Sequence, residues 1–280
     1  MQPRTGVDLL RRIEAYYDAA PRSAALAEDH GPLTLFLNRR PGWHYYARPR
    51  LGDPTPVRHA DVAAMRERQR ALGVPESFEW VAEVTPSLRA AAEGAGLEVH
   101  EHPLMVLDLA AFEGAAPRPP AGTDVRLVDP EGSDLATLRA VANLGFASPG
   151  TRVGPVGREA LPGAAERLDA AGVVALRERL RTGLTVMVAA ADGEGPLAVG
   201  SHQPIGEVTE VVGVATLPAA RRRGLATAVT QALVADALGR GCDVVFLSAD
   251  DDAVARLYGR IGFRHVATAL IAEPATPTLT

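Results

Sequence analysis

The sequence predicts an α/β protein in two parts, and three observations lead to this prediction. From residue 123 onward, apolar runs of strand length alternate with segments of helical periodicity. The proline-rich segment 116–122 holds few core-forming side chains, as a linker does. Hydrophobic residues make up 47% of the 280 residues, enough for a core in each part. We therefore expect a smaller N-terminal α/β domain over 1–115, the linker, and a C-terminal domain over 123–280.

In the N-terminal part, amphipathic periodicity predicts helices, and short apolar clusters bounded by Gly or Pro predict strands. The expected order is helix 7–19, strands 33–37 and 43–47, helix 60–72, strand 78–84, helix 86–93 and strand 99–109.

In the C-terminal part, three strands joined by tight turns follow two helices, and strand and helix then alternate. The expected order is strand 124–128, helix 133–144 stopped by Gly145, loop 147–163, helix 164–181, strands 184–191, 197–205 and 208–216, a helix after Gly224, strand 243–248, a helix from Asp252, and a last strand from Phe263.

Composition excludes several classes of protein. The net charge of −5 argues against a dedicated nucleic-acid binder, which needs a basic face. No apolar run is long enough to span a membrane, and the amphipathic N-terminus does not resemble a signal peptide. The single cysteine, Cys242, allows no internal disulfide and is expected in the core. We expect a cytoplasmic protein that binds neither nucleic acid nor membrane.

The segment 212–226 carries the strongest functional signal. An apolar strand leads into a proline turn, three arginines and a helix, with the spacing Arg221-x-x-Gly224-x-Ala226. This spacing places backbone N–H groups and positive charge at a helix N-terminus, where Gly224 lets a ligand approach closely. The pattern predicts an anion site suited to a pyrophosphate; the alternative is a solvated arginine turn.

A second pattern follows about thirty residues later. A buried strand over 243–248 leads to a short helix capped by an aspartate, and then to Leu257-Tyr258-x-x-x-Gly262-Phe263. In this order and spacing, the two motifs resemble those of the GNAT superfamily of acyl-CoA-dependent N-acetyltransferases, over roughly 123–272. The resemblance implies a mixed, largely antiparallel sheet flanked by helices, with acetyl-CoA as co-substrate.

The resemblance also assigns residues to the co-substrate. The phosphates would lie on the backbone amides at the start of the helix, with arginines nearby. The pantetheine would run beside the strand before this loop. The cofactor-binding residues expected in this way are Val214, Ala215, Thr216, Arg221, Arg222, Arg223, Gly224, Leu225, Ala226 and Thr227.

Two residues are expected to act as catalysts. By resemblance, Tyr258 points at the CoA sulfur and protonates the leaving thiolate; the alternative is a tyrosine of the core. Glu210, four residues before Val214 on the same strand, is expected to take the proton of the amine, directly or through water; the alternative is an exposed strand glutamate. Gly213 fits the strand bulge that the family uses to polarise the thioester.

Several other residues are weaker candidates. Asp250, Ser201 and His202 are rivals of Glu210 as the base. The family often has an asparagine near the start of the last helix, where this chain has the acidic run 250–252, from which Asp252 would cap the helix. The alternating pair His100 and His102 has no supporting cluster, and we expect no metal site.

The two halves show a common pattern at an offset of 166 residues. This offset places Gly96-Leu97 on Gly262-Phe263, Trp80-Val81 on Phe246-Leu247, and Trp43–Tyr46 on Thr209–Val212, without a gap. It also places Thr55, Arg58 and Ala92 where Arg221, Gly224 and Tyr258 stand. We interpret the N-terminal half as a degenerate GNAT-like copy or, alternatively, as a generic α/β cap domain.

The function predicted from these residues is N-acetyl transfer from acetyl-CoA to a primary amine, by direct attack on the thioester. The acceptor would be a small molecule or a peptide, and the protein a monomer or a homodimer. A non-catalytic acyl-CoA-binding or sensor protein, and a transferase of a longer acyl group, are the alternatives.

Overall fold

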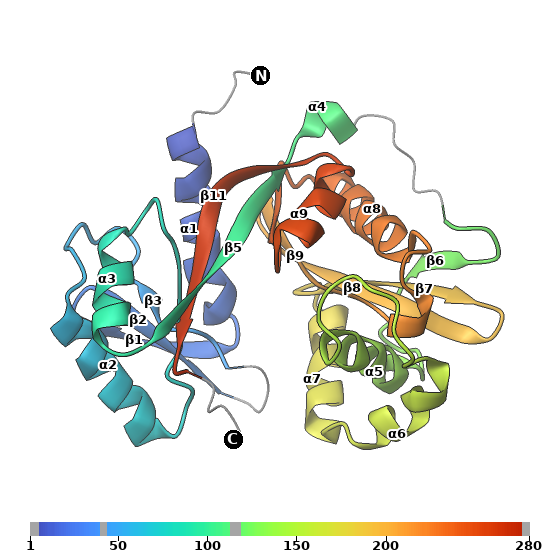
Figure 1. Ribbon diagram of the computed structural model, residues 1–280, viewed down its shortest axis with the longest axis horizontal. Coiled ribbons are helices and arrows are strands. Elements are labelled where there is room, and N and C mark those ends of the chain that lie inside the picture. Colours follow the sequence, from blue (N-terminus) through green and yellow to red (C-terminus); the bar gives the residue numbers. More distant parts are fainter. Residues whose placement is uncertain (1–5, 40–43, 113–118, 276–280) are drawn as a thin grey trace. The chain divides into compact units, whose positions relative to one another are not determined.

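The computed structural model describes residues 6–39, 44–112 and 119–275, and the chain divides into two compact units (Figure 1). Unit 1 comprises Met1–Leu104 and His265–Thr280, and unit 2 comprises Met105–Arg264. Each unit has its own hydrophobic core. Among the described residues, no helix is long and apolar enough to cross a membrane.

The core of unit 2 is built on a mixed sheet. Its strands follow the order β6-β7-β8-β9-β10, and after β10 come first the end of β5 and then the end of β11 that belong to this unit. Neighbours from β6 to β9 are antiparallel, whereas β9 and β10 are parallel. The strands are β6 (Asp124–Leu127), β7 (Val186–Asp192), β8 (Gly195–Ile205), β9 (Val208–Thr216) and β10 (Val244–Ser248).

Helices cover both faces of this sheet. Figure 1 shows α8 on one face of β7, β8 and β9, and α5, α6 and α7 on the other. The packing is close, because a Cβ atom built on Gly200 of β8 would lie 2.8 Å from Cγ1 of Val229 on α8, and one built on Gly145 of α5 would lie 2.9 Å from Cβ of Ala215. The helices are α4 (Leu109–Phe112), α5 (Leu135–Phe146), α6 (Leu161–Glu166), α7 (Ala170–Arg181), α8 (Leu225–Gly239) and α9 (Asp252–Gly259), with 3₁₀ turns η1 (Arg158–Ala160) and η2 (Pro218–Ala220).

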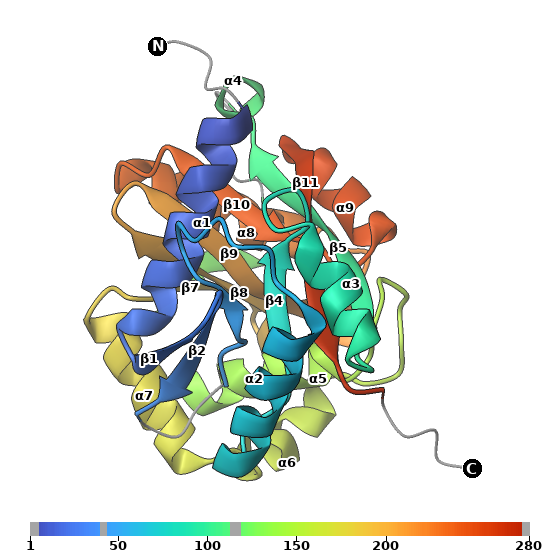
Figure 2. The ribbon, with the colours of Figure 1, turned by 90° about the vertical axis from the view of Figure 1, so that its left-hand side faces the viewer.

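Unit 1 repeats the strand–helix pattern on a smaller scale. An antiparallel sheet of order β1-β2-β3 stands beside β4, which pairs antiparallel with β11, and β5 lies next to β11. In Figure 2, α2 and α3 lie together, and their apolar side chains contribute to the core that also contains Phe78 and Trp80 of β4. The elements are α1 (Gly6–Arg22), β1 (Ala25–His30), β2 (Leu33–Asn38), β3 (Arg48–Pro49), α2 (His59–Leu72), β4 (Phe78–Val81), α3 (Ser87–Gly94), β5 (Glu98–Leu107) and β11 (Phe263–Glu273).

The compact units do not follow the expected boundaries at 115 and 123. The chain passes from unit 1 to unit 2 within β5 and returns within β11, so that most of β11 belongs to unit 1 and not to a domain over 123–280. Of the expected linker, residues 116–118 lie outside the described part, and residues 119–122 have irregular backbone and turn conformation.

The internal repeat is visible in the elements, with one correction. The offset of 166 residues places α2 on α8, β4 on β10, α3 on α9 and β5 on β11 to within two residues at each start. It fails at β3, because Ala47 pairs in parallel with Phe78 where Val208 pairs with Val244. Ala47 therefore corresponds to Val208 and not to Gly213, and the ungapped match of Trp43–Tyr46, whose first residue is outside the described part, is wrong.

Four other expectations differ from the structure. The strand β1 was not expected, and the strand expected over 43–47 is replaced by β3 at Arg48–Pro49. Helix α5 continues through Gly145 to Phe146. The single helix expected over 164–181 is broken, because the carboxylate of Asp169 accepts hydrogen bonds of 3.1 Å from N–H of Ala171 and Gly172 and starts α7 there.

Candidate functional site

The site lies in unit 2, where β9 and β10 separate. The two strands pair in parallel from Val208 and Val244 as far as Glu210 and Phe246; beyond this point β9 continues to Thr216, and β10 ends at Ser248. A cavity of about 950 Å³ opens at this divergence, at the upper end of the size of small-molecule pockets. Its walls come from the segments 145–151, 210–216, 220–227 and 248–260.

A β-bulge in β9 lines the cavity. Val212 is opposite Ser201 and Ala215 is opposite Val199, so Gly213 and Val214 both face the single residue Gly200. Gly213 has φ of +65°, a conformation that glycine adopts at little cost. The bulge predicted at Gly213 is thus confirmed, and it interrupts the regular ladder beside the cavity.

The N-terminus of α8 opens into the same cavity. Gly224 is the N-cap, with φ of +82°, and it has no side chain to cap the helix. The first turn carries no acidic residue, and Gly224, Leu225, Ala226 and Thr227 all line the cavity. The partial positive charge of a helix N-terminus therefore faces the cavity without a competing carboxylate, as an anion site requires.

The three arginines before α8 point in different directions. Arg221 and Arg222 line the cavity, and Arg222 is exposed with φ of +62°. The guanidinium of Arg221 donates to backbone carbonyls of the segment 145–152. Arg223 is exposed and is not among the residues that line the cavity; it lies close enough to Asp192 to help lower the pKa of that carboxyl, after Arg158 and the N–H of Glu194.

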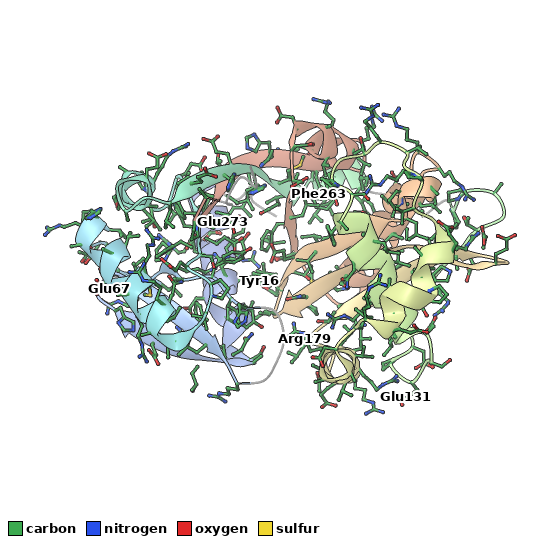
Figure 3. All side chains as sticks on the ribbon, turned by 60° about the horizontal axis from the view of Figure 1, so that its bottom comes forward. Tyr16, Glu67, Glu131, Arg179, Phe263 and Glu273 are labelled. Carbon is green, nitrogen blue, oxygen red and sulfur yellow. The ribbon has the colours of Figure 1, made fainter. Side chains whose placement is uncertain are left out.

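Tyr258 is buried on α9 and lines the cavity. Its side chain is 8% exposed, and its ring packs edge-to-face on Phe263, labelled in Figure 3, with centroids 5.9 Å apart. Burial raises the pKa of the phenol well above its usual value of 10. The phenol is therefore protonated at neutral pH.

Glu210 lies where β9 and β10 stop pairing. Its Cα is opposite Phe246 on one side and Gln203 on the other, and the residue is half-buried and lines the cavity. The structure thus brings Glu210, the bulge at Gly213 and Tyr258 to one cavity.

The rivals of Glu210 are less well placed. His202 is fully buried, with Nδ1 2.9 Å from Oγ1 of Thr209 and Nε2 2.9 Å from Oδ2 of Asp236 on α8, and it does not line the cavity. Ser201 also does not line the cavity, whereas the exposed Asp250 does.

Two hydroxyl groups at the cavity were missed as side-chain ligands. Oγ1 of Thr216 and Oγ of Ser248 are buried and have no hydrogen-bond partner within the described part of the chain. They stand at the ends of β9 and β10, where the strands have diverged, and both residues line the cavity. A buried hydroxyl without a partner costs about 1–3 kcal/mol, so a ligand that bonds to it gains this energy. For Ser248, the available signal was a polar residue at the end of the otherwise apolar strand β10.

The acidic run over 250–252 caps α9 through a residue other than the one expected. Oδ1 of Asp251 accepts a hydrogen bond of 2.8 Å from N–H of Val254, so Asp251 is the N-cap and Asp252 is the first helical residue. The prediction that Asp252 caps the helix is therefore wrong.

The corresponding region of unit 1 lacks these features. The N-cap of α2 is Arg58, with φ of −114°, and Oδ2 of Asp61 accepts a hydrogen bond of 2.8 Å from its N–H. A carboxylate thus lies in the first turn, where α8 has none. Ala92 of α3 provides no phenol in place of Tyr258.

The remaining candidates belong to the core or to the surface. Cys242 is buried within the core of unit 2, and burial raises the pKa of its thiol. No group of three or more His, Cys, Asp or Glu within the described ranges is arranged to hold a metal ion, so His100 and His102 have no third ligand there.

The comparisons with known proteins agree with this geometry. Residues 159–263 match the sequence model of the acetyltransferase (GNAT) family. None of the curated proteins compared with the sequence is a significant match. The GNAT resemblance inferred from the two motifs is thus confirmed for this region of the chain.

Solved structures show the same fold over most of the chain. A GCN5-related N-acetyltransferase from Kribbella flavida has a TM-score of 0.70 at 22% identity, over 96% of this chain and 97% of that chain. A putative GNAT-family acetyltransferase from Novosphingobium aromaticivorans has a TM-score of 0.55 at 18% identity, over 98% and 100%. A tandem GNAT protein from the clavulanic acid biosynthesis pathway has 0.57 at 16%, over 88% and 79%. The GNAT-like mixed sheet flanked by helices is confirmed, and the likeness to the tandem protein extends into unit 1.

Proposed function

We propose that this protein is an N-acetyltransferase that transfers an acetyl group from acetyl-CoA to a primary amine. The observation that carries the proposal is that the uncapped N-terminus of α8, the bulge in β9 and the buried phenol of Tyr258 line one cavity. The GNAT family match of this region supports the same reaction class.

The residues of the cavity fit the parts of acetyl-CoA. The backbone N–H groups at the start of α8 would receive the pyrophosphate, and the exposed Arg222 would add positive charge there. The pantetheine would run beside Val214, Ala215 and Thr216 in the gap between β9 and β10. Its amides match the unpartnered hydroxyls of Thr216 and Ser248. When bound, acetyl-CoA supplies the activated thioester carbonyl.

Two protons must move during the reaction. The amine nitrogen forms a bond to the acetyl carbon, and the bond from that carbon to sulfur breaks. Glu210 takes the proton that the amine loses, directly or through water. Tyr258, whose phenol is protonated at working pH, gives its proton to the leaving thiolate. N–H groups near the bulge at Gly213 would stabilise the charge that develops on the carbonyl oxygen.

Single substitutions at the catalytic positions test this assignment. We expect Tyr258→Phe to bind acetyl-CoA normally but to lower kcat by about 10²–10⁴-fold, the usual worth of a general acid. Glu210→Gln should lower kcat at neutral pH and weaken its dependence on pH. Thiol release with a panel of amines measures turnover, and calorimetry measures binding of acetyl-CoA.

A loop variant tests the binding half separately. Gly224→Trp places a bulky residue at φ of +82° at the start of α8, where it strains the proposed phosphate loop, and we expect it to abolish binding of acetyl-CoA. If the wild-type protein binds acetyl-CoA but acetylates no amine, a non-catalytic acyl-CoA-binding role replaces the enzyme. If longer acyl-CoA thioesters are turned over faster than acetyl-CoA, the proposal that the transferred group is acetyl is wrong. Failure of the wild-type protein to bind any of them contradicts the proposal.

A further inference from the structure

The segment 145–151 forms one wall of the cavity, and the side chain of Arg221 binds backbone carbonyl groups at both ends of it. Nη1 of Arg221 donates to the carbonyl oxygen of Arg152 at 3.1 Å, and Nη2 donates to the carbonyl oxygens of Gly145, at 2.8 Å, and Ser148. We infer that Arg221 is a positioning residue that fixes this wall, and that it is not a phosphate ligand.

The surroundings of the guanidinium agree with this role. Arg221 is half-buried, and burial lowers its pKa. Its hydrogen bonds run to backbone carbonyl groups from residues about seventy positions earlier in the chain. The planar guanidinium presents several donors in a fixed fork, which suits convergent carbonyl oxygens, whereas lysine carries the same charge as a compact point.

Backbone contacts beside Arg221 involve the residues that follow the wall in the chain. N–H of Gly154 donates to the carbonyl oxygen of Pro218 at 3.1 Å, and N–H of Ala219 donates to that of Val156 at 2.9 Å. The η2 turn is therefore bonded to the residues directly after the wall, and it leads into the loop that precedes α8. Because Arg221 directly follows η2, the wall and the proposed phosphate loop are held as one part.

The wall offers an apolar surface to the ligand. Phe146 lines the cavity with 59% of its surface exposed, directly after Gly145, whose backbone lies against Ala215 and Thr216. These are the residues beside which the pantetheine is proposed to run. Loss of Arg221 should therefore weaken binding of the pantetheine and leave binding of the phosphates unchanged.

Amide hydrogen exchange on the ligand-free protein tests the wall directly. We expect peptides within 145–157 to exchange faster in Arg221→Gln and in Arg221→Lys than in the wild type. The matched control Arg222→Gln, at the exposed neighbouring arginine, should leave their exchange unchanged. Unchanged exchange in Arg221→Gln, or wild-type exchange in Arg221→Lys, would overturn the inference. Thermal unfolding identifies any variant that has lost its fold. If Arg221→Gln is unfolded, the exchange measured in Arg221→Lys, which keeps the charge, decides the role of Arg221.

Binding of two probes tests the ligand side, which rests on the proposed function. We expect Kd for CoA to rise about tenfold in Arg221→Gln and Arg221→Lys, the effect of about one lost hydrogen-bonded contact. Kd for adenosine 3′,5′-bisphosphate should stay within about twofold. Equal weakening of both probes in Arg221→Gln, with affinity retained in Arg221→Lys, would instead make Arg221 a phosphate ligand. If the wild type binds neither probe, the proposed function fails, while the exchange result still decides the role of Arg221.

Discussion

Asp251 and Asp252 stand side by side at the start of α9, and their roles differ because of one hydrogen bond. Asp251 has the extended backbone of an N-cap, and its carboxylate binds N–H of Val254. Asp252 is already helical, so its carboxylate interacts with the helix only through the partial charge of the N-terminus. The distinction matters for the site because α9 carries Tyr258.

We expect Asp251→Ala to lower the free energy of unfolding by about 1 kcal/mol, the usual cost of a lost N-cap. Asp252→Ala should cost only about 0.3–1 kcal/mol, since it removes a favourable charge but no cap. Urea unfolding of the two variants beside the wild type measures both values. A larger loss in Asp252→Ala would contradict the assignment of the cap.

At the scale of the secondary-structure elements, α8 packs against β8. This packing positions the helix whose N-terminus opens into the cavity. Gly200 permits this contact: a Cβ there would lie 2.8 Å from Cγ1 of Val229 and 3.0 Å from Cδ1 of Leu233. Both partners are fully buried and have little freedom to move.

Gly200→Ala is therefore expected to destabilise the protein by about 1–3 kcal/mol through overpacking. Gly239→Ala is the matched control, because nothing lies within 4 Å of a Cβ at the end of α8. Thermal unfolding should show a lower Tm for the first variant and an unchanged or slightly higher Tm for the second. Equal Tm values would mean that α8 moves away from the sheet at no cost.

The same helix–sheet contact contains a buried imidazole. Because Asp236 is a carboxylate that accepts, Nε2 of His202 carries the proton, and Nδ1 accepts from the hydroxyl of Thr209. Burial lowers the pKa of His202 below its usual 6.5, and the bond to Asp236 offsets this only in part. The folded protein thus keeps His202 neutral at pH values where the unfolded chain already binds a proton.

Stability should consequently fall as the pH drops below about 6.5, with His202 contributing up to about 1.4 kcal/mol per pH unit. His202→Gln removes the titrating group, so its unfolding free energy should change less between pH 7 and pH 5 than that of the wild type. Denaturant unfolding across this range gives both slopes. Parallel slopes would show that other groups cause the pH dependence.

The sequence predicted these elements to different degrees. Strands β8 and β9 and helix α8 were found because their apolar runs are long and end close to Gly or Pro. The strand β10 was found because residues 244–247 form an unbroken apolar run. The strand β1 was missed because Glu28, Asp29 and His30 give it the composition of a loop. Gly145 did not end α5, because it serves the close approach to β9 instead of a left-handed turn.

The parts of the site that could be predicted are those in which a local backbone conformation or a fixed spacing requires a particular residue type. Gly213 and Gly224 adopt positive φ, and a spacing motif led to Tyr258. The partners of Arg221 and the unpartnered hydroxyls of Thr216 and Ser248 depend on tertiary contacts and on the divergence of two strands, which no local pattern records.

For the whole molecule, the division of the chain between the units is the feature that no local pattern showed. Unit 2 is continuous, whereas unit 1 needs residues from both sides of it, because β4 pairs with β11. A fragment over 123–280 would keep all of β11 without β4, and would leave β10 without its neighbour β5. Such unpaired strand edges favour aggregation.

We therefore expect the fragment 105–264 to be more soluble than the fragment 123–280 and to unfold more cooperatively. Size-exclusion chromatography and thermal unfolding compare the two fragments, with the full chain as reference. A soluble, cooperative fragment 123–280 with the same Tm as 105–264 would contradict this division.

The return of the chain through β11 also sets an order for folding during synthesis. Domains generally fold in the order in which they leave the ribosome, N-terminal first. Here β4 cannot pair before residues 269–272 of β11 are made, and these are translated only after every residue of unit 2. The unit that begins first is therefore the one that is completed last, and its early strands must stay soluble in the meantime.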